Sequence, residues 1–148
     1  MGIGMKKVTK HWGNELWIAD GESTPYATKR ILFLAGNRTS LQVHKYKIET
    51  NYVLSGTGIL HKSKEPLDIE KFIAEGMTTV EVDEYEKTFE VINLEPNVVF
   101  HVKPGYVHRV IAITDLEFME TSTTELDDVY RLQDDFGRTH GRISYEHE

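Results

Sequence analysis

Two histidines, a glutamine and a glutamate stand at spacings from which they could bind one divalent metal ion. After Gly36, Gln42 and His44 are two residues apart, and Glu49 follows five residues later. Residues i and i+2 of a strand share a face, so Gln42 and His44 are expected to project together. Glu49 falls where the next strand would begin, and neighbouring strands lie about 4.8 Å apart. His108 comes much later, after a Pro-Gly pair that allows a tight bend.

The chemistry of these four side chains suits a metal better than any one of them does alone. Imidazole is a ligand for zinc, iron, nickel and copper, whereas oxygen ligands suit harder ions such as manganese. Two nitrogen and two oxygen donors can leave a coordination position open for water or substrate. An ionised Glu49 inside a barrel would be costly without a cationic partner. His44 by itself would equally be an ordinary interior histidine, so the combined spacing carries the prediction.

Three further side chains near these positions are candidates for substrate binding or catalysis. Tyr46 is expected on the same strand face as His44, either as a pocket hydroxyl or as a ring that fills the barrel. Arg109 could grip an anionic group bidentately, but strand parity turns it away from His108 and favours an outward salt bridge. Arg138 could fold back over the barrel mouth, or it could be a charge at the end of a helix.

The elements that would position these residues are mostly short strands. Ten stretches alternate in polarity or are rich in β-branched and aromatic residues, with turn residues between them, which predicts an all-β sandwich or barrel. They are residues 15–19, 30–34, 40–47, 51–54, 58–61, 78–82, 89–92, 98–102, 110–113 and 117–121. The acid-rich segment 62–90 is expected to be an insertion between strands, in which residues 67–76 form either a short helix or a loop.

One helix is predicted, over residues 122–137. Ser122 and Glu125 have the spacing of a capping box, and Asp127 and Asp128 would lie in the first turns, where the helix dipole favours acids. Leu126 begins an apolar stripe with helical spacing, and a glycine follows the last apolar residue. We expect this helix to pack on the outside of the β-domain.

Composition narrows the class of protein. The chain has 148 residues and no cysteine, which excludes a disulfide framework, a thiolate metal site and a cysteine nucleophile. The net charge of -7 disfavours general binding to nucleic acid, which needs a basic surface. No apolar run is long enough to cross a membrane, and the first residues lack the apolar stretch of a signal peptide. A cytoplasmic protein of one domain, over residues 1–148, is expected.

The spacings resemble those of the cupin superfamily. Its first motif is G(X)5HXH(X)3-4E(X)6G, and this chain matches every spacing from Gly36 onward, with Gln42 in place of the first histidine. Its second motif contains PXGXXH, of which Gly105 and His108 are present and Lys103 replaces the proline. The resemblance implies a double-stranded β-helix, or jelly-roll barrel, with its core over about residues 10–138 and a metal inside the mouth.

Further residues resemble the cupin domain of mannose-6-phosphate isomerases, in particular the C-terminal domain of bifunctional isomerase–guanylyltransferases. The shared positions are Trp12-Gly13, residues 40–44, Glu49, residues 105–109 and the run from Asp127 to Arg138. The resemblance implies zinc as the metal, with manganese, iron, nickel and cobalt as alternatives. The ligands that it implies are Gln42, His44, His108 and Glu49. This chain departs from the pattern at Tyr46, where the family has a histidine, and at Thr50-Asn51, where it has His-Trp.

The function implied by this resemblance is an aldose–ketose isomerase that works through an enediol on a sugar or sugar phosphate. Lys29 resembles a lysine of the isomerase pattern and is a candidate for binding phosphate. The alternatives are a sugar-binding cupin without catalysis and an iron-dependent cupin dioxygenase. A homodimer is expected, because strand edges must be covered and the segment through Trp17 offers a strand and two large aromatic residues. Metal affinity is expected to fall below about pH 6.5, where free histidine protonates.

Overall fold

Side chains alternate between buried and more exposed positions along most strands, and this alternation defines the inside of the molecule. In β3 (Ala27–Phe33) every second side chain is buried, and the first part of β5 (Glu49–Ser55) repeats the pattern. Successive side chains of a strand point to opposite faces, so these strands turn one face to the core and the other to solvent. The computed structural model describes residues 6–125 and 127–141.

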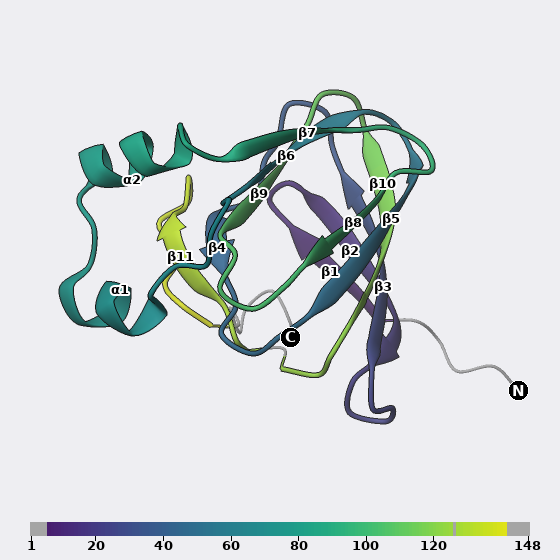
Figure 1. Cartoon of the computed structure of the whole chain (residues 1–148). Helices are drawn as coiled ribbons and strands as arrows, with labels where there is room; N and C mark the ends of the chain where they lie inside the picture. Colours follow the sequence, from purple (N-terminus) through teal and green to yellow (C-terminus); the bar gives the residue numbers. More distant parts are fainter. Residues whose placement is uncertain (1–5, 126, 142–148) are drawn as a thin grey trace, which may run out of the picture.

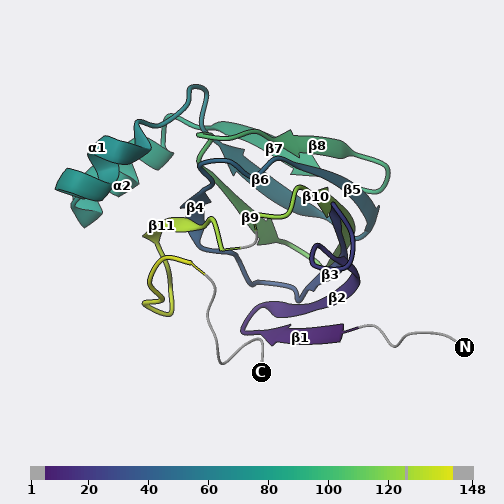
Figure 2. The ribbon, with the colours of Figure 1, turned by 90° about the horizontal axis from the view of Figure 1, so that it is seen from below.

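The strands form two antiparallel sheets that face each other and curl into a barrel (Figure 1). In spatial order, the six-stranded sheet consists of β1 (Lys6–Lys10), β2 (Gly13–Asp20), β3, β10 (Leu116–Ser122), β5 and β8 (Val99–Val102). The five-stranded sheet consists of β11 (Tyr130–Gln133), β4 (Leu41–Val43), β9 (His108–Ala112), β6 (Gly58–Lys62) and β7 (Glu90–Leu94). Seen from below, β1 lies at the free edge of the larger sheet (Figure 2).

The main core fills the space between the two sheets. Trp12 stacks on Phe33 with ring centroids 3.9 Å apart, and Phe33 stacks on Phe118 at 5.6 Å. The other buried members of this core are Ile31, Val53, Leu60, Leu94, Phe100, Val102, Val110, Ala112 and Leu116. Because these residues come from both sheets, the barrel closes around its own apolar interior and leaves the polar inward positions near one end.

The expected strands coincide with observed ones except in two places. The stretch 40–47 is a strand only at Leu41–Val43, after which the chain bends at Lys45 and Tyr46. The stretch 78–82 is wrong as a strand and forms the start of helix α2 (Thr79–Glu86). Thr78 and Glu81 complete a capping box there, each side chain bonding the backbone of the other. This local cap outweighs the β-branched residues that suggested a strand.

The insertion 62–90 packs against the five-stranded sheet. It contains α1 (Ile69–Glu75) and α2, so the alternative of a helix near residues 67–76 is the one observed. Both helices lie outside the barrel, beside β4 and β11 (Figure 1). A second apolar cluster joins them to the sheet through Leu41, Val43, Ile69, Val82, Phe89 and Val107. Among the described residues, no helix has the length and apolar character to span a membrane.

The predicted helix over 122–137 is wrong where the structure describes it. Ser122 ends β10, and Tyr130 begins β11, which pairs with β4. Leu126 lies outside the described residues. Tyr130 and Leu132 pack against the second apolar cluster. Pairing with an open strand edge and partial burial of these two side chains therefore outweigh the local helical pattern.

Candidate metal centre

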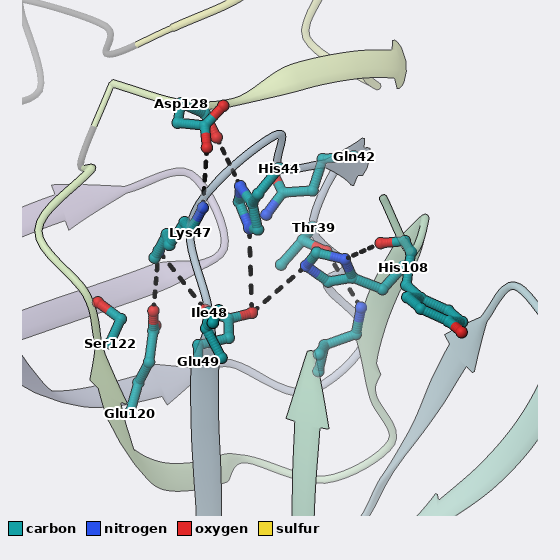
Figure 3. A network of polar contacts seen from close by, with 12 residues as sticks. Thr39, Gln42, His44, Lys47, Ile48, Glu49, His108, Glu120, Ser122 and Asp128 are labelled. Carbon is teal, nitrogen blue, oxygen red and sulfur yellow. Dashed lines mark hydrogen bonds and ion pairs between the residues drawn. The ribbon is translucent and has the colours of Figure 1, made fainter. Parts of the chain in front are cut away.

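The candidate metal ligands come from the ends of three strands. His44 directly follows β4, Glu49 begins β5 after a short loop, and His108 begins β9. Gln42 of β4 is paired in register with His108. Strand ends therefore bring residues that are 64 positions apart in the chain to one place, as Figure 3 shows.

The donor atoms of three of these residues converge. Glu49 Oε1 lies 3.5 Å from His108 Nε2 and 4.0 Å from His44 Nε2. The three ligand atoms all lie within 4.8 Å of one another, and all three side chains are buried. This His-Glu-His cluster could bind a metal ion.

Backbone carbonyl groups fix the tautomer of both histidines. His44 Nδ1 is 2.6 Å from the carbonyl oxygen of Asp128, and His108 Nδ1 is 3.1 Å from that of Tyr106. A carbonyl oxygen only accepts, so each neutral ring carries its proton on Nδ1 and turns a lone pair on Nε2 toward Glu49. Nε2 of His44 is buried with no hydrogen-bond partner. Two basic nitrogens and a carboxylate oxygen, with no proton between the nitrogens, fit a divalent cation.

Gln42 lies beside this cluster, but its side chain is hydrogen-bonded to a neighbouring serine. Its side chain is half-buried, it lines the same pocket, and its Oε1 accepts a hydrogen bond from the Ser40 hydroxyl at 2.8 Å. A half-turn of the amide would exchange its oxygen and nitrogen, and the serine hydroxyl can also accept. The amide group thus has the chemistry of a fourth ligand, while the three other residues form the cluster.

A buried ion pair borders the candidate ligands. Lys47 Nζ is 3.0 Å from Glu120 Oε1 and 3.5 Å from Glu49 Oε2. Burial by itself would lower the pKa of Lys47, but Glu120 and Glu49 beside it outweigh burial and raise the pKa. Burial by itself would raise the pKa of Glu120, but Lys47 holds it well below its ordinary value. Lys47 therefore stays protonated and Glu120 stays ionised.

Burial lowers the pKa of the two candidate histidine ligands and raises that of the glutamate. It lowers the pKa of His44, with the Lys47 charge adding to the effect, and it lowers the pKa of His108 to about 4. It raises the pKa of Glu49 well above its ordinary value, and the neighbouring Glu120 raises it further. In the metal-free protein the site thus favours neutral imidazoles and a proton on Glu49, which an arriving cation would displace.

Several solved structures have a similar fold. The chain superimposes on the capsular polysaccharide assembling protein CapF from Staphylococcus aureus with a TM-score of 0.62 and 16% identity, over 89% of this chain and 35% of CapF. It matches KdgF from Halomonas sp. with a TM-score of 0.59 and 15% identity, over 86% of this chain and 98% of KdgF. Ectoine synthase from P. lautus gives 0.60 and 12%, over 86% and 81%.

These neighbours are double-stranded β-helix proteins of the cupin type. The chain has the cupin fold. It spans about a third of the length of CapF, and at these identities the likeness concerns the fold. No protein-family model matches the sequence, and no curated protein matches it. The expected fold class, an all-β cupin barrel, is confirmed apart from its C-terminal helix.

A polar pocket extends from the candidate metal ligands into the cupin barrel. Its volume is about 130 Å³, and a water needs about 10–15 Å³ of such space, so it can hold an ion together with a small organic ligand. Lys29 lines it, with Nζ 4.0 Å from Glu15 and 4.4 Å from the centre of the Trp17 ring. Arg138 lines it from the C-terminal segment and forms an ion pair with Asp134.

Two sequence-predicted site residues lie elsewhere in the barrel. Tyr46 is 62% exposed and is absent from the pocket lining, because the strand ends at Val43 and parity no longer applies. Arg109 is buried on the side of β9 away from His108. It donates to Glu86 of α2 at 3.1 Å and to the carbonyl oxygen of Thr39 at 3.0 Å. The salt bridge expected for Arg109 is present, but α2 covers it.

Sequence reasoning missed the residue that organises the loop between β4 and β5. The Asp128 carboxylate accepts hydrogen bonds from the backbone N–H groups of Lys45, Tyr46 and Lys47, at 2.9, 2.6 and 2.9 Å. Its carbonyl oxygen also holds His44 (Figure 3). In the sequence, Asp128 fits a helix start, and nothing local indicates partners 81–84 residues away. This residue fixes the loop that carries Lys47 and ends at Glu49.

Proposed function

We propose that this cupin is a divalent-metal enzyme, with zinc as its metal, that isomerises a sugar or sugar phosphate between aldose and ketose. The observation that carries the proposal is the convergence of two carbonyl-fixed histidines and Glu49 at the edge of a polar pocket. A metal held by His44, Glu49 and His108, with the Gln42 amide as a fourth donor, would supply Lewis acidity to a carbonyl or hydroxyl oxygen. Mannose 6-phosphate is the substrate suggested by the sequence resemblance.

The pocket contains a base and an acid suited to proton transfer. An aldose–ketose isomerisation moves a proton from one carbon to its neighbour and another between their oxygens. Glu120 is ionised beside Lys47, so its carboxylate can accept the proton from one carbon and return it to the neighbouring carbon. The protonated Lys47 can donate to the carbonyl oxygen and recover a proton from the neighbouring hydroxyl. Both residues line the pocket that the candidate ligands border. In this proposal Glu49 binds the metal and takes no part in proton transfer.

The pocket also contains a cation suited to an anionic substrate group. Lys29 lines the pocket. By contrast, Arg30 forms an ion pair with Glu117 on the outer face of the barrel, and Lys103 is exposed. Lys29 supports a phosphate or another anion as part of the substrate, and in our proposal it binds that group.

The test combines metal analysis with an activity assay. Purified protein is analysed for bound metal, stripped with chelator and reloaded with zinc, manganese, iron, nickel or cobalt. Each form is assayed for interconversion of mannose 6-phosphate and fructose 6-phosphate, together with a panel of other aldose phosphates, without oxygen. We expect activity to follow metal and Glu120→Gln to abolish it while metal content stays unchanged. A fully loaded protein that isomerises no member of the panel would contradict the proposal.

A second function is favoured by the donor set itself. Two histidines and one carboxylate are the ligands of non-haem iron(II) oxygenases, and Gln42 Oε1 is engaged by Ser40. Under this alternative the iron-loaded protein would consume oxygen in the presence of an organic substrate. Oxygen uptake by the iron form, with no isomerisation by any metal form, would favour the oxygenase over the isomerase.

A further inference from the structure

A row of five side chains crosses the inner face of the six-stranded sheet beyond the candidate metal ligands. Strand register pairs neighbouring members of the row on successive strands from β2 to β8. In spatial order they are Trp17, Lys29, Glu120, Asn51 and Phe100. All five line the pocket. The row therefore places three polar side chains between two aromatic rings on one wall.

Asn51 has an unused hydrogen-bond donor in this row. The residue is 2% exposed, and its Nδ2 atom is buried with no hydrogen-bond partner. Buried donors nearly always have a partner, so one that lacks it calls for an explanation. Because Asn51 lines the pocket, the acceptor can come from a molecule bound there.

The neighbours of Asn51 indicate the chemistry of that molecule. Lys29 donates hydrogen bonds and the ionised Glu120 accepts them, so the wall offers donors and an acceptor in alternation. A hydroxyl group both donates and accepts, and a polyhydroxylated ligand presents several of them. The rings of Trp17 and Phe100 provide apolar surface for its C–H groups at either end. A purely apolar ligand would leave the Nδ2 donor of Asn51 without an acceptor.

The distance to the metal cluster fits a ligand of the size of one sugar unit. Glu49 and Asn51 are two residues apart on β5 and share its buried face. Two residues of strand span about 6.8 Å. A ligand with one oxygen at the metal cluster therefore extends to Asn51 with a hydroxyl a few carbons away.

We propose that Asn51 donates a hydrogen bond to a hydroxyl oxygen of a polyhydroxylated ligand and selects for that hydroxyl. The inference rests on the proposed function, because the candidate metal site anchors the other end of the ligand. Asn51 is then a specificity-determining residue, and it stands at a position where this chain departs from the resemblance that suggested an isomerase.

The experiment follows the side-chain amide of Asn51 directly by NMR. The ¹⁵N-labelled, zinc-loaded full chain is titrated with xylitol, and its Asn51 signal is identified by its absence from Asn51→Leu. We expect the signal to shift in a saturable manner with xylitol and to stay in place with 1,5-pentanediol, which lacks the interior hydroxyls. Loss of one hydrogen bond corresponds to an affinity for xylitol about tenfold lower in Asn51→Leu. Asn51→Asp, which keeps the size and removes the donor, is expected to lose affinity similarly.

The matched control is Thr50→Val on the outward face of the same strand, where Thr50 is exposed and bonded to His101. It should bind xylitol as the wild type does. An unmoved Asn51 signal at saturating xylitol, or wild-type affinity in both folded Asn51 variants, would overturn the inference. The isomerase assay is scored separately. A xylitol response without isomerisation refutes the proposed reaction and retains the subsite, whereas isomerisation without the response refutes the subsite.

Discussion

The imidazole of His108 gives the metal-free protein a specific sensitivity to acid. Burial lowers the pKa of His108 from 6.5 to about 4, so this imidazole stays neutral in the folded protein at a pH where it is already protonated in the unfolded chain. Its contribution to the free energy of unfolding is therefore complete above about pH 6.5 and is lost as the pH falls toward 4. We expect His108→Gln to reduce the acid-induced loss in free energy of unfolding by about 3 kcal/mol between these values. Urea unfolding of both proteins at several pH values measures it, and parallel curves would contradict it.

The same shifts change the expected pH dependence of metal binding. Burial keeps His44 and His108 neutral below pH 6.5. Their protonation therefore does not weaken metal binding at that pH, contrary to the expectation from the sequence. A proton on Glu49 competes instead, because its pKa is raised. We expect metal uptake to release more protons as the pH falls, which calorimetry in buffers of different ionisation enthalpy detects. Proton release that does not change with pH would contradict this competition.

Removal of a candidate ligand tests the site itself. His44→Ala or Glu49→Ala takes away a donor, and we expect metal affinity to fall by more than about 100-fold. The barrel core contains neither residue, so circular dichroism should remain that of the wild type. Lys45→Ala is the matched control, because its side chain pairs outward with Glu70 of α1. Equal metal content in all three variants, by elemental analysis, would exclude these residues as ligands.

At the scale of elements, one aspartate joins the C-terminal segment to the loop between β4 and β5. Asp128→Ala removes the carboxylate that holds three backbone N–H groups while keeping the carbonyl that bonds His44. Hydrogen bonds to a charged group contribute about 1.5–3 kcal/mol each. In the variant, water bonds the freed N–H groups and offsets part of the loss. We expect a loss of about 2 kcal/mol in free energy of unfolding and about tenfold weaker metal binding. Urea titration and metal titration measure these effects, with exposed Glu125→Gln as the control.

A second element-level contact ties α2 to the barrel. Arg109 is 1% exposed and pairs with Glu86, and breaking a buried pair from one side costs about 3–5 kcal/mol. We expect Arg109→Met to lower the free energy of unfolding by about 3 kcal/mol and to leave metal affinity unchanged. Weaker metal binding without loss of stability would instead place Arg109 in the site.

Sequence patterns predicted elements well where the determining interactions are local. The two-residue period on β5 and the spacing of Gln42, His44 and Glu49 depend on neighbours in the chain. β5 and the start of β4 were therefore predicted near their observed positions. The end of β4 at Val43 depends on Asp128, so the outward position of Tyr46 was not predictable from parity. The helix expected over 122–137 was wrong for the same reason, since Tyr130–Gln133 pairs with β4 across the fold.

At the scale of the whole molecule, we still propose a homodimer, with β1 as the interface. Trp12 is part of the core and Trp17 lines the pocket, so neither aromatic residue covers a strand edge. The proposal therefore rests on β1, which ends the six-stranded sheet among the described residues and pairs with β2 alone there. Light scattering at micromolar concentration should give the mass of a dimer, and Thr9→Pro should shift it toward the monomer. A monomeric wild type would contradict the proposal.

The bond between His44 and Asp128 also sets an order of events during protein synthesis. A nascent chain that has emerged only as far as β10 contains His44, Glu49 and His108 and the strands that position them. It lacks the carbonyl that fixes the His44 tautomer and the carboxylate that fixes the loop. During synthesis, the candidate metal site therefore reaches its folded geometry only after Asp128 has left the ribosome, later than all three candidate ligands.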